Sequence, residues 1–272
     1  AAGNTTYYAK KDDNIKPVIL LVGAEHGGEM EGIAALLNLI NVIETGKDFR
    51  GRRWDYINDN WRNFRLVLIP CMNPDGRSRV PFNSMAGKTL ETMRYYMQGT
   101  WKDGSLCGWP DCKKVHPIID HVQFLGAYFN DDGVNILADN VFSPMANETK
   151  ILMELVDREA PDFTLHLHGG DNCINMLLSP DYAPVCIKNR VQEFDQRLYR
   201  RCSERGLRYY AFDKMKQDGI NQPVPFTIVS AIPHICGGIS LVYESNMALD
   251  YPGTPVYSYD EILDSHMTLF RS

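Results

Sequence analysis

Short apolar runs that alternate with longer segments of helical periodicity constrain the fold of this 272-residue chain most strongly. Residues 17–23 have the pattern of a strand covered on both faces, and residues 29–44 follow with apolar side chains at helical spacing. Further strands are expected at 65–70, 162–167, 208–212 and 239–243, and further helices at 144–159, 183–205 and from Ser258 onward. This alternation predicts an α/β fold with a mostly parallel sheet and helices on both faces.

Helix ends are marked by local signals. Ser143 followed by Pro144 is typical of an N-cap with proline at the first helical position, and Gly206 is expected to end the helix before it. Ser258 and Glu261 form a capping box. The segment from 71 to about 130 lacks clear periodicity, and its aromatic and Met-rich part, 85–109, either shapes a binding site or packs a long loop.

Composition excludes several classes of protein. The chain has 28 Lys and Arg against 34 Asp and Glu, a formal net charge of −6, and 44% hydrophobic residues. It is therefore neither a generally basic nucleic-acid binder nor a disordered tail. Its apolar runs are too short to span a bilayer, and the sequence leaves the oligomeric state open.

The seven cysteines leave the redox compartment open. An odd number cannot be fully paired within one chain, and most are expected to be small buried hydrophobes. Cys107 and Cys112 flank a turn and could form a disulfide in an oxidising compartment. The compartment stays unassigned, with a lean toward a secreted or periplasmic protein.

Polar side chains collect where the predicted strands end. His26 and Glu29 follow the first strand in His-Gly-Gly-Glu, His168 ends the strand at 162–167, and Glu244 ends the strand at 239–243. Ligands of such sheets bind beyond the carboxyl ends of the strands, so these side chains are expected to meet at one edge.

Two imidazoles and one carboxylate are suitable zinc ligands that leave a fourth position for water, as in catalytic zinc sites. His26, Glu29 and His168 are therefore the candidate ligands; the alternative for His26 and Glu29 is a solvated helix start. His166 alternates with His168 along the strand and is more easily read as a core residue or a support for a ligand. Glu244 is the candidate proton carrier, with pairing to an arginine as its alternative.

These motifs together resemble the zinc metallocarboxypeptidase family of the funnelin type, the relatives of carboxypeptidase A. The resemblance rests on five pieces in the same order over nearly the whole chain: His26-Gly-Gly-Glu29, Asn73-Pro-Asp-Gly76, Gly133-Val-Asn135, His168 and Glu244. It implies a single domain over 1–272, with about eight strands in a mixed sheet and helices on both sides. Only 25 residues precede His26, so one or two leading strands of the family are expected to be truncated or built differently.

The resemblance also implies roles for individual residues. His26, Glu29 and His168 would hold one Zn²⁺ per chain, and Glu244 would act as general base and then general acid. Asn135 stands where the family has an aspartate that orients the first zinc-bound histidine, and its carbonyl could do the same more weakly.

The chain departs from the family where relatives bind the terminal carboxylate of the substrate. Leu137 and Ala138 occupy the places of the family's Asn-Arg pair, and apolar groups cannot replace a bidentate arginine. The oxyanion-stabilising arginine has no evident counterpart, although Arg77, Arg79 and Arg94 are available upstream.

We therefore expect a divergent member that hydrolyses a peptide or amide bond of its substrate without strict need for a free C-terminal carboxylate. The alternative is a catalytically impaired binding protein that keeps the fold. A serine hydrolase is disfavoured because no G-x-S-x-G motif occurs.

Overall fold

The computed structural model describes residues 16–139, 145–171, 173–178, 182–218, 226–253 and 256–272. The apolar runs form the centre of a five-stranded sheet with the order β2-β1-β5-β7-β6. Its strands are β1 (Val18–Gly23), β2 (Arg65–Ile69), β5 (Phe163–Gly170), β6 (Met176–Leu178) and β7 (Ile239–Asn246). All neighbouring strands pair in parallel except β6, which runs antiparallel to β7. The mixed, mostly parallel sheet is confirmed, but it has five strands plus a separate two-stranded sheet among the described residues rather than eight.

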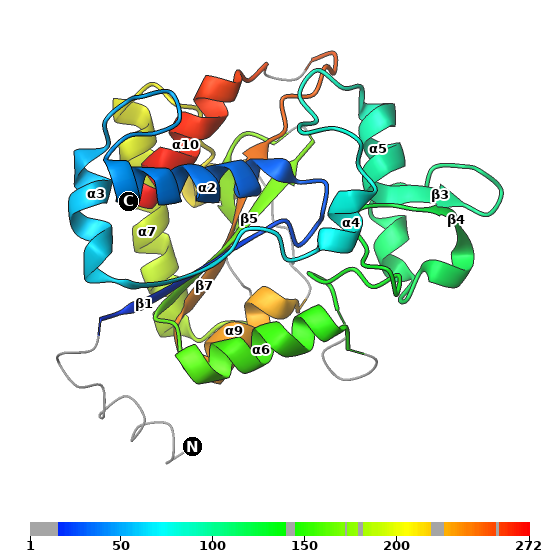
Figure 1. Cartoon of the computed structure of the whole chain (residues 1–272), viewed down its shortest axis with the longest axis horizontal. Coiled ribbons are helices and arrows are strands. Elements are labelled where there is room, and N and C mark those ends of the chain that lie inside the picture. Colours follow the sequence, from blue (N-terminus) through cyan, green and yellow to red (C-terminus); the bar gives the residue numbers. More distant parts are fainter. Residues whose placement is uncertain (1–15, 140–144, 172, 179–181, 219–225, 254–255) are drawn as a thin grey trace.

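Helices cover both faces of the sheet (Figure 1). One face carries α2 (Met30–Thr45), α3 (Asp55–Asn60), α7 (Val185–Glu204) and α10 (Tyr259–Arg271), and the other carries α6 (Asn147–Glu159) and α9 (Ile228–Cys236). Leu21 of β1 packs in the first core, whereas Leu20 and Val22 pack in the second. Because the strand is buried on both sides, its sequence is continuously apolar instead of alternating.

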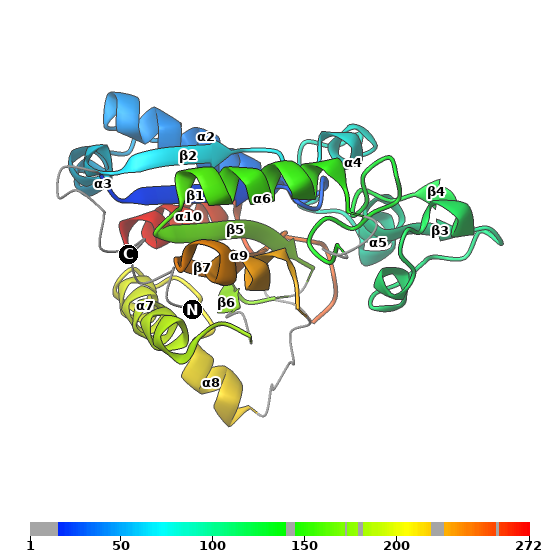
Figure 2. The ribbon, with the colours of Figure 1, turned by 90° about the horizontal axis from the view of Figure 1, so that it is seen from below.

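The segment without periodicity folds into a separate lobe beyond the carboxyl ends of the parallel strands (Figures 1 and 2). It contains α4 (Pro74–Ser78), α5 (Leu90–Gln98) and an antiparallel pair of strands, β3 (Gly99–Trp101) and β4 (Val122–Leu125). Two short 3₁₀ turns of the lobe lie at Asp111–Lys114 and Ile119–His121, and a third, outside the lobe, lies at Trp61–Asn63 before β2. Several methionines form the core beneath this lobe, among them Met30, Met93 and Met97. The lobe thus stands over the edge where the sequence places the candidate ligands.

Some boundaries differ from the expectations. The strand expected at 208–212 is wrong: residues 207–211 have no regular structure, and Phe212 begins α8 (Phe212–Gln217). The backbone N–H of Phe212 and the hydroxyl of Tyr209 donate to the carboxylate of Asp195, so this segment is held by a side chain of α7. The available edge of β7 is occupied by β6 instead.

The helix signals hold where the structure describes them. The Ser258 hydroxyl accepts from the N–H of Glu261 at 3.1 Å, which confirms the cap of α10. Ser143 and Pro144 lie outside the described residues, and α6 is described from Asn147. No helix among the described residues is both long and apolar enough to cross a bilayer.

The cysteines are free thiols. Cys107 and Cys112 are buried in a small apolar cluster with Ile118 and Phe129 and are not bonded to each other. The structure thus supports the interpretation of these two residues as buried hydrophobes, not as a disulfide.

Candidate metal centre

A tight turn after β1 brings His26 and Glu29 to the sheet edge. The N–H of Gly27 donates to the carbonyl of Ala127 at 2.8 Å, and the N–H of Glu29 donates to the carbonyl of His26 at 3.0 Å. A Cβ on Gly27 would lie 2.1 Å from the backbone nitrogen of Arg77, so only glycine lets α4 approach this closely. His168 lies on β5, the neighbour of β1, and reaches the same edge.

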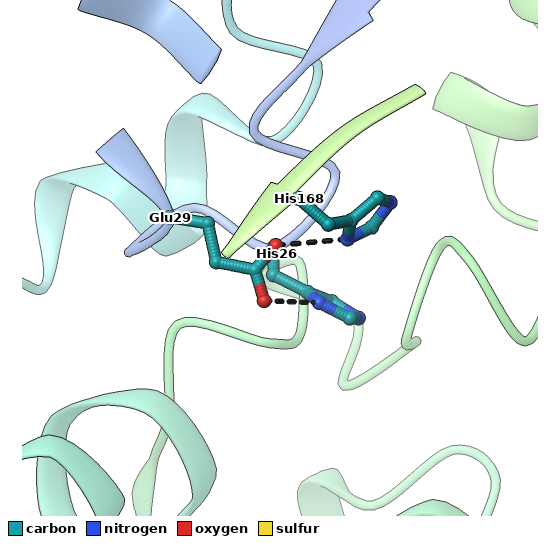
Figure 3. A group of neighbouring side chains, drawn as sticks. All are labelled: His26, Glu29 and His168. Carbon is teal, nitrogen blue, oxygen red and sulfur yellow. Dashed lines mark hydrogen bonds and ion pairs between the residues drawn. The ribbon is translucent and has the colours of Figure 1, made fainter. Parts of the chain in front are cut away.

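The three candidate ligands converge. One potential ligand atom from each of His26, Glu29 and His168 lies within 4.8 Å of the others, and all three side chains are buried. The carboxylate of Glu29 lies between the rings, with Oε1 2.7 Å from Nδ1 of His26 and Oε2 2.8 Å from Nδ1 of His168 (Figure 3). The ring centroids of His26 and His168 are 5.0 Å apart.

The arrangement fits a divalent ion. Glu29 Oε2 and His168 Nδ1 are both buried and lie 2.8 Å apart as an ion pair, and neither makes a hydrogen bond of good geometry among the described residues. Buried polar atoms that lack well-formed hydrogen bonds are costly, and an ion bound by both of these atoms would remove that cost. Two imidazole nitrogens and a carboxylate oxygen are the donor set of open zinc sites.

The outer nitrogen of each imidazole contacts an oxygen acceptor. His26 Nε2 lies 3.1 Å from Oδ1 of Asn135, and His168 Nε2 lies 2.7 Å from Oε2 of Glu25. An acceptor at Nε2 holds the proton there and leaves the Nδ1 lone pair for a metal. The other oxygen of Glu25 lies 2.8 Å from Nδ1 of His166.

Sequence reasoning gave Glu25 no role. The available signal was its place at the strand end directly before His26, together with two alternating histidines on β5. His166 is not among the candidate ligands and lies next to Glu25, in keeping with its interpretation as a buried support.

Neighbouring histidines lower the pKa of two carboxylates of the site, Glu25 and Glu29. Burial alone would raise the pKa of Glu25, but the charges of His166 and His168 and their hydrogen bonds hold that pKa well below its usual range. Burial likewise opposes ionisation of Glu29, and the charges of His26 and His168 lower its pKa to about 2. Anionic oxygens are the form that binds a cation directly or supports its imidazole ligands.

Glu244 stands beside this cluster. It is directly opposite His168 in the register of β5 and β7 and is only partly buried. Burial raises the pKa of Glu244 to about 7, against the attraction of His168, and the nearby charge of Glu29 adds to the rise. No ion pair between Glu244 and an arginine occurs in the part of the chain that the structure describes, so the alternative of an arginine partner finds no support.

The arginines upstream hold loops. Arg77 donates to the carbonyls of Val80 and Phe82, and Arg79 donates to those of Gly126 and Phe129. Their guanidinium groups are therefore engaged with backbone. Arg94 lies on α5, and its guanidinium group makes no hydrogen bond or ion pair within the described ranges.

Leu137 and Ala138, which occupy the places of the family's Asn-Arg pair, contribute to packing and to a backbone turn. Leu137 packs against the core formed by α6 and α9, and the N–H of Ala138 donates to the carbonyl of Asn135 at 3.1 Å. These two residues place no cation near the candidate ligands.

Aromatic side chains connect the centre with the surface. The ring centroid of Tyr128 lies 4.3 Å from that of His26, and the ring centroid of Trp109 lies 5.7 Å from that of Tyr128. Trp109 is 46% exposed, so the series of rings reaches solvent. Trp109 belongs to the segment that sequence reasoning singled out, whereas Tyr128 was missed.

The sequence was compared with family models and with curated proteins. Residues 3–223 match the family described as zinc carboxypeptidase. A search of curated proteins found no match.

Solved structures share the fold at low sequence identity. A metallo-carboxypeptidase from Burkholderia cenocepacia matches with a TM-score of 0.58 at 14% identity, over 95% of this chain and 56% of that one. A metallo-carboxypeptidase from Pseudomonas aeruginosa matches with a TM-score of 0.57 at 12% identity, over 96% and 57%. Carboxypeptidase A from Helicoverpa armigera matches with a TM-score of 0.51 at 14% identity, over 96% and 60%. The chain thus spans less than two thirds of the length of these proteins.

Proposed function

Because this chain belongs to the zinc carboxypeptidase family, we propose that it is a zinc-dependent hydrolase of peptide or amide bonds. His26, Glu29 and His168 hold one zinc ion, and Glu244 carries the proton. The observation that carries the proposal is the convergence of three buried ligand atoms within 4.8 Å, with Glu244 in register beside them.

The residues have separate tasks. Zinc, when bound, polarises the scissile carbonyl and acidifies a water molecule. Glu244, which makes no ion pair with an arginine among the described residues, accepts a proton from the attacking water and returns it to the leaving amine. Asn135 accepts a hydrogen bond from His26 and keeps its Nδ1 directed at the ion.

The substrate class follows from what surrounds the centre. Leu137 and Ala138 offer no charge to a C-terminal carboxylate, and Arg77 and Arg79 are bound to carbonyls. We therefore assign to this chain a peptide or amide substrate whose free carboxylate is not strictly required.

A catalytically impaired binding protein is the second candidate. The apolar residues at 137 and 138 favour it, because a relative that has lost carboxylate recognition can lose turnover as well. The position of Glu244 favours the enzyme, since a binding protein has no need of a proton carrier beside the metal.

One experiment separates these possibilities. Zinc-loaded protein and its Glu244→Gln variant are incubated with matched peptides that end in a free carboxylate or an amide, and cleavage is followed by mass spectrometry. We expect cleavage of both peptide forms by the wild type and of neither by the variant. Strong preference for the free carboxylate would overturn the substrate assignment, and zinc binding without any cleavage would identify the binding protein.

A further inference from the structure

Glu25 lies completely inside the protein, between two histidines of β5. It is 1% exposed, and His166 and His168 are at most 1% exposed. Oε1 lies 2.8 Å from Nδ1 of His166, and Oε2 lies 2.7 Å from Nε2 of His168. A buried carboxylate is stable only with strong partners, and here each oxygen has an imidazole.

The backbone is turned to place Glu25 there. Ala24, the preceding residue, has φ of 50°, a left-handed conformation that is unfavourable for a residue with a Cβ. Its carbonyl is held by the N–H of Asn73 at 3.0 Å, and the carbonyl of Gly23 by the N–H of Met72 at 2.9 Å. The chain thus maintains a strained residue at the point that directs Glu25 inward.

The two candidate imidazole ligands are supported unequally. His26 contacts a neutral amide oxygen of Asn135 at 3.1 Å, whereas His168 contacts a carboxylate oxygen at 2.7 Å. Hydrogen bonds to ionised acceptors are shorter and stronger than those to neutral ones. The firmer support therefore lies on the His168 side of the centre.

We propose that Glu25 is a positioning residue for the metal centre, and that His166 anchors it. Glu25 accepts the Nε2 proton of His168, which fixes the tautomer and directs Nδ1 at the ion. His166 holds the second oxygen of Glu25, so the carboxylate cannot rotate away. This inference rests on the proposed zinc site.

Replacing Glu25 with glutamine preserves size but leaves one oxygen. The amide can accept from only one imidazole, and its NH₂ group then faces a nitrogen that carries a proton. Loss of such a support of a ligand lowers metal affinity by about 10- to 100-fold. Glu25→Gln is therefore expected to raise the zinc dissociation constant by about that factor.

Glu31 provides a matched control. It is also a buried carboxyl, on the first turn of α2, and its Oε2 makes no hydrogen bond in the part of the chain that the structure describes. Since it makes no hydrogen bond to an imidazole among the described residues, Glu31→Gln is expected to leave the zinc dissociation constant nearly unchanged.

The test measures zinc affinity and imidazole protonation separately. Zinc-free wild type, Glu25→Gln and Glu31→Gln are titrated against a chromophoric zinc chelator, and near-UV circular dichroism checks their folding. In ¹⁵N-edited NMR, we expect the Nε2–H proton of His168 to appear downfield in the wild type and in Glu31→Gln and to be lost in Glu25→Gln. His166→Asn, which frees one oxygen of Glu25, is expected to weaken zinc binding less and serves if Glu25→Gln does not fold.

The outcomes separate the two proposals. Equal zinc affinity of the wild type and Glu25→Gln, or of the wild type and His166→Asn if the first variant does not fold, would overturn the role of Glu25 while leaving the zinc site intact. A wild type that binds no zinc would overturn the proposed function as well.

Discussion

His266 makes the stability of this protein sensitive to mild acid. It lies on α10 with no solvent exposure, and its Nδ1 is 2.8 Å from the carbonyl of Ile262. The centroid of its ring is 5.2 Å from that of Tyr243, and the two rings are inclined at 75°. Burial lowers the pKa of His266 from 6.5 to about 4, and the Ile262 carbonyl only partly opposes this shift. The folded protein therefore holds the neutral imidazole where the unfolded chain takes up a proton.

The sign and size of the effect follow from linkage. Because the folded pKa lies below the unfolded one, the unfolded state binds more protons between pH 6.5 and 4, and the free energy of unfolding falls as the pH is lowered through that window. At ~1.4 kcal/mol per pKa unit, a change from pH 7.5 to 5 removes about 2 kcal/mol of stability.

His266→Phe isolates this contribution. Phenylalanine keeps a ring beside Tyr243 and cannot titrate; it removes the contact of Nδ1 with the Ile262 carbonyl, whereas Nε2 has no hydrogen-bond partner among the described residues. Urea denaturation of both proteins at pH 7.5 and pH 5 gives the change in the free energy of unfolding. We expect the wild type to lose about 2 kcal/mol more than the variant over this interval. Equal losses in the two proteins would refute the reasoning.

Three further predictions concern the metal centre. Glu244→Gln is expected to retain zinc but to lower kcat by about 10²- to 10⁴-fold, measured by peptide hydrolysis; an unchanged kcat would exclude Glu244 as the proton carrier. Gly27→Ala places a Cβ 2.1 Å from the backbone nitrogen of Arg77, so urea denaturation should show a free energy of unfolding lower by about 1–3 kcal/mol. Zinc titration should show a weaker affinity, and wild-type values in both measurements would contradict the close approach. Asn135→Asp gives His26 an ionised acceptor and removes the buried Nδ2 atom, which makes no hydrogen bond among the described residues. Competition with a chelator should therefore show zinc bound about 10-fold more tightly, and weaker binding would argue against the contact between residue 135 and His26.

Much of the fold could be predicted because its strands are short apolar runs, and three of them, β1, β5 and β7, are almost completely buried. The apolar runs that became β1, β2, β5 and β7 need no neighbour to be recognised. The helix α9 escaped recognition because nearly all of its residues are buried, so it has no polar face, and Pro233 lies within it. The three-residue strand β6 is too short to show any periodicity.

The candidate ligands could also be anticipated. His26 and Glu29 follow β1, and His168 lies near the end of its parallel neighbour β5, so all three reach the edge where the carboxyl ends of these strands meet. Glu25 could not be assigned in the same way, since its direction depends on the left-handed backbone of Ala24 and no pattern of residue types reveals that conformation. Tyr128 was missed because its contact with His26 depends on how the lobe folds back over the strand ends.

Anomalous diffraction from zinc-loaded crystals at the zinc absorption edge would locate the ion at the site of His26, Glu29 and His168. We expect one strong peak per chain, at about 2.0–2.2 Å from Nδ1 of His26, Nδ1 of His168 and a carboxylate oxygen of Glu29. The absence of a peak between these atoms, or coordination through Nε2 of either histidine, would contradict the proposed zinc site.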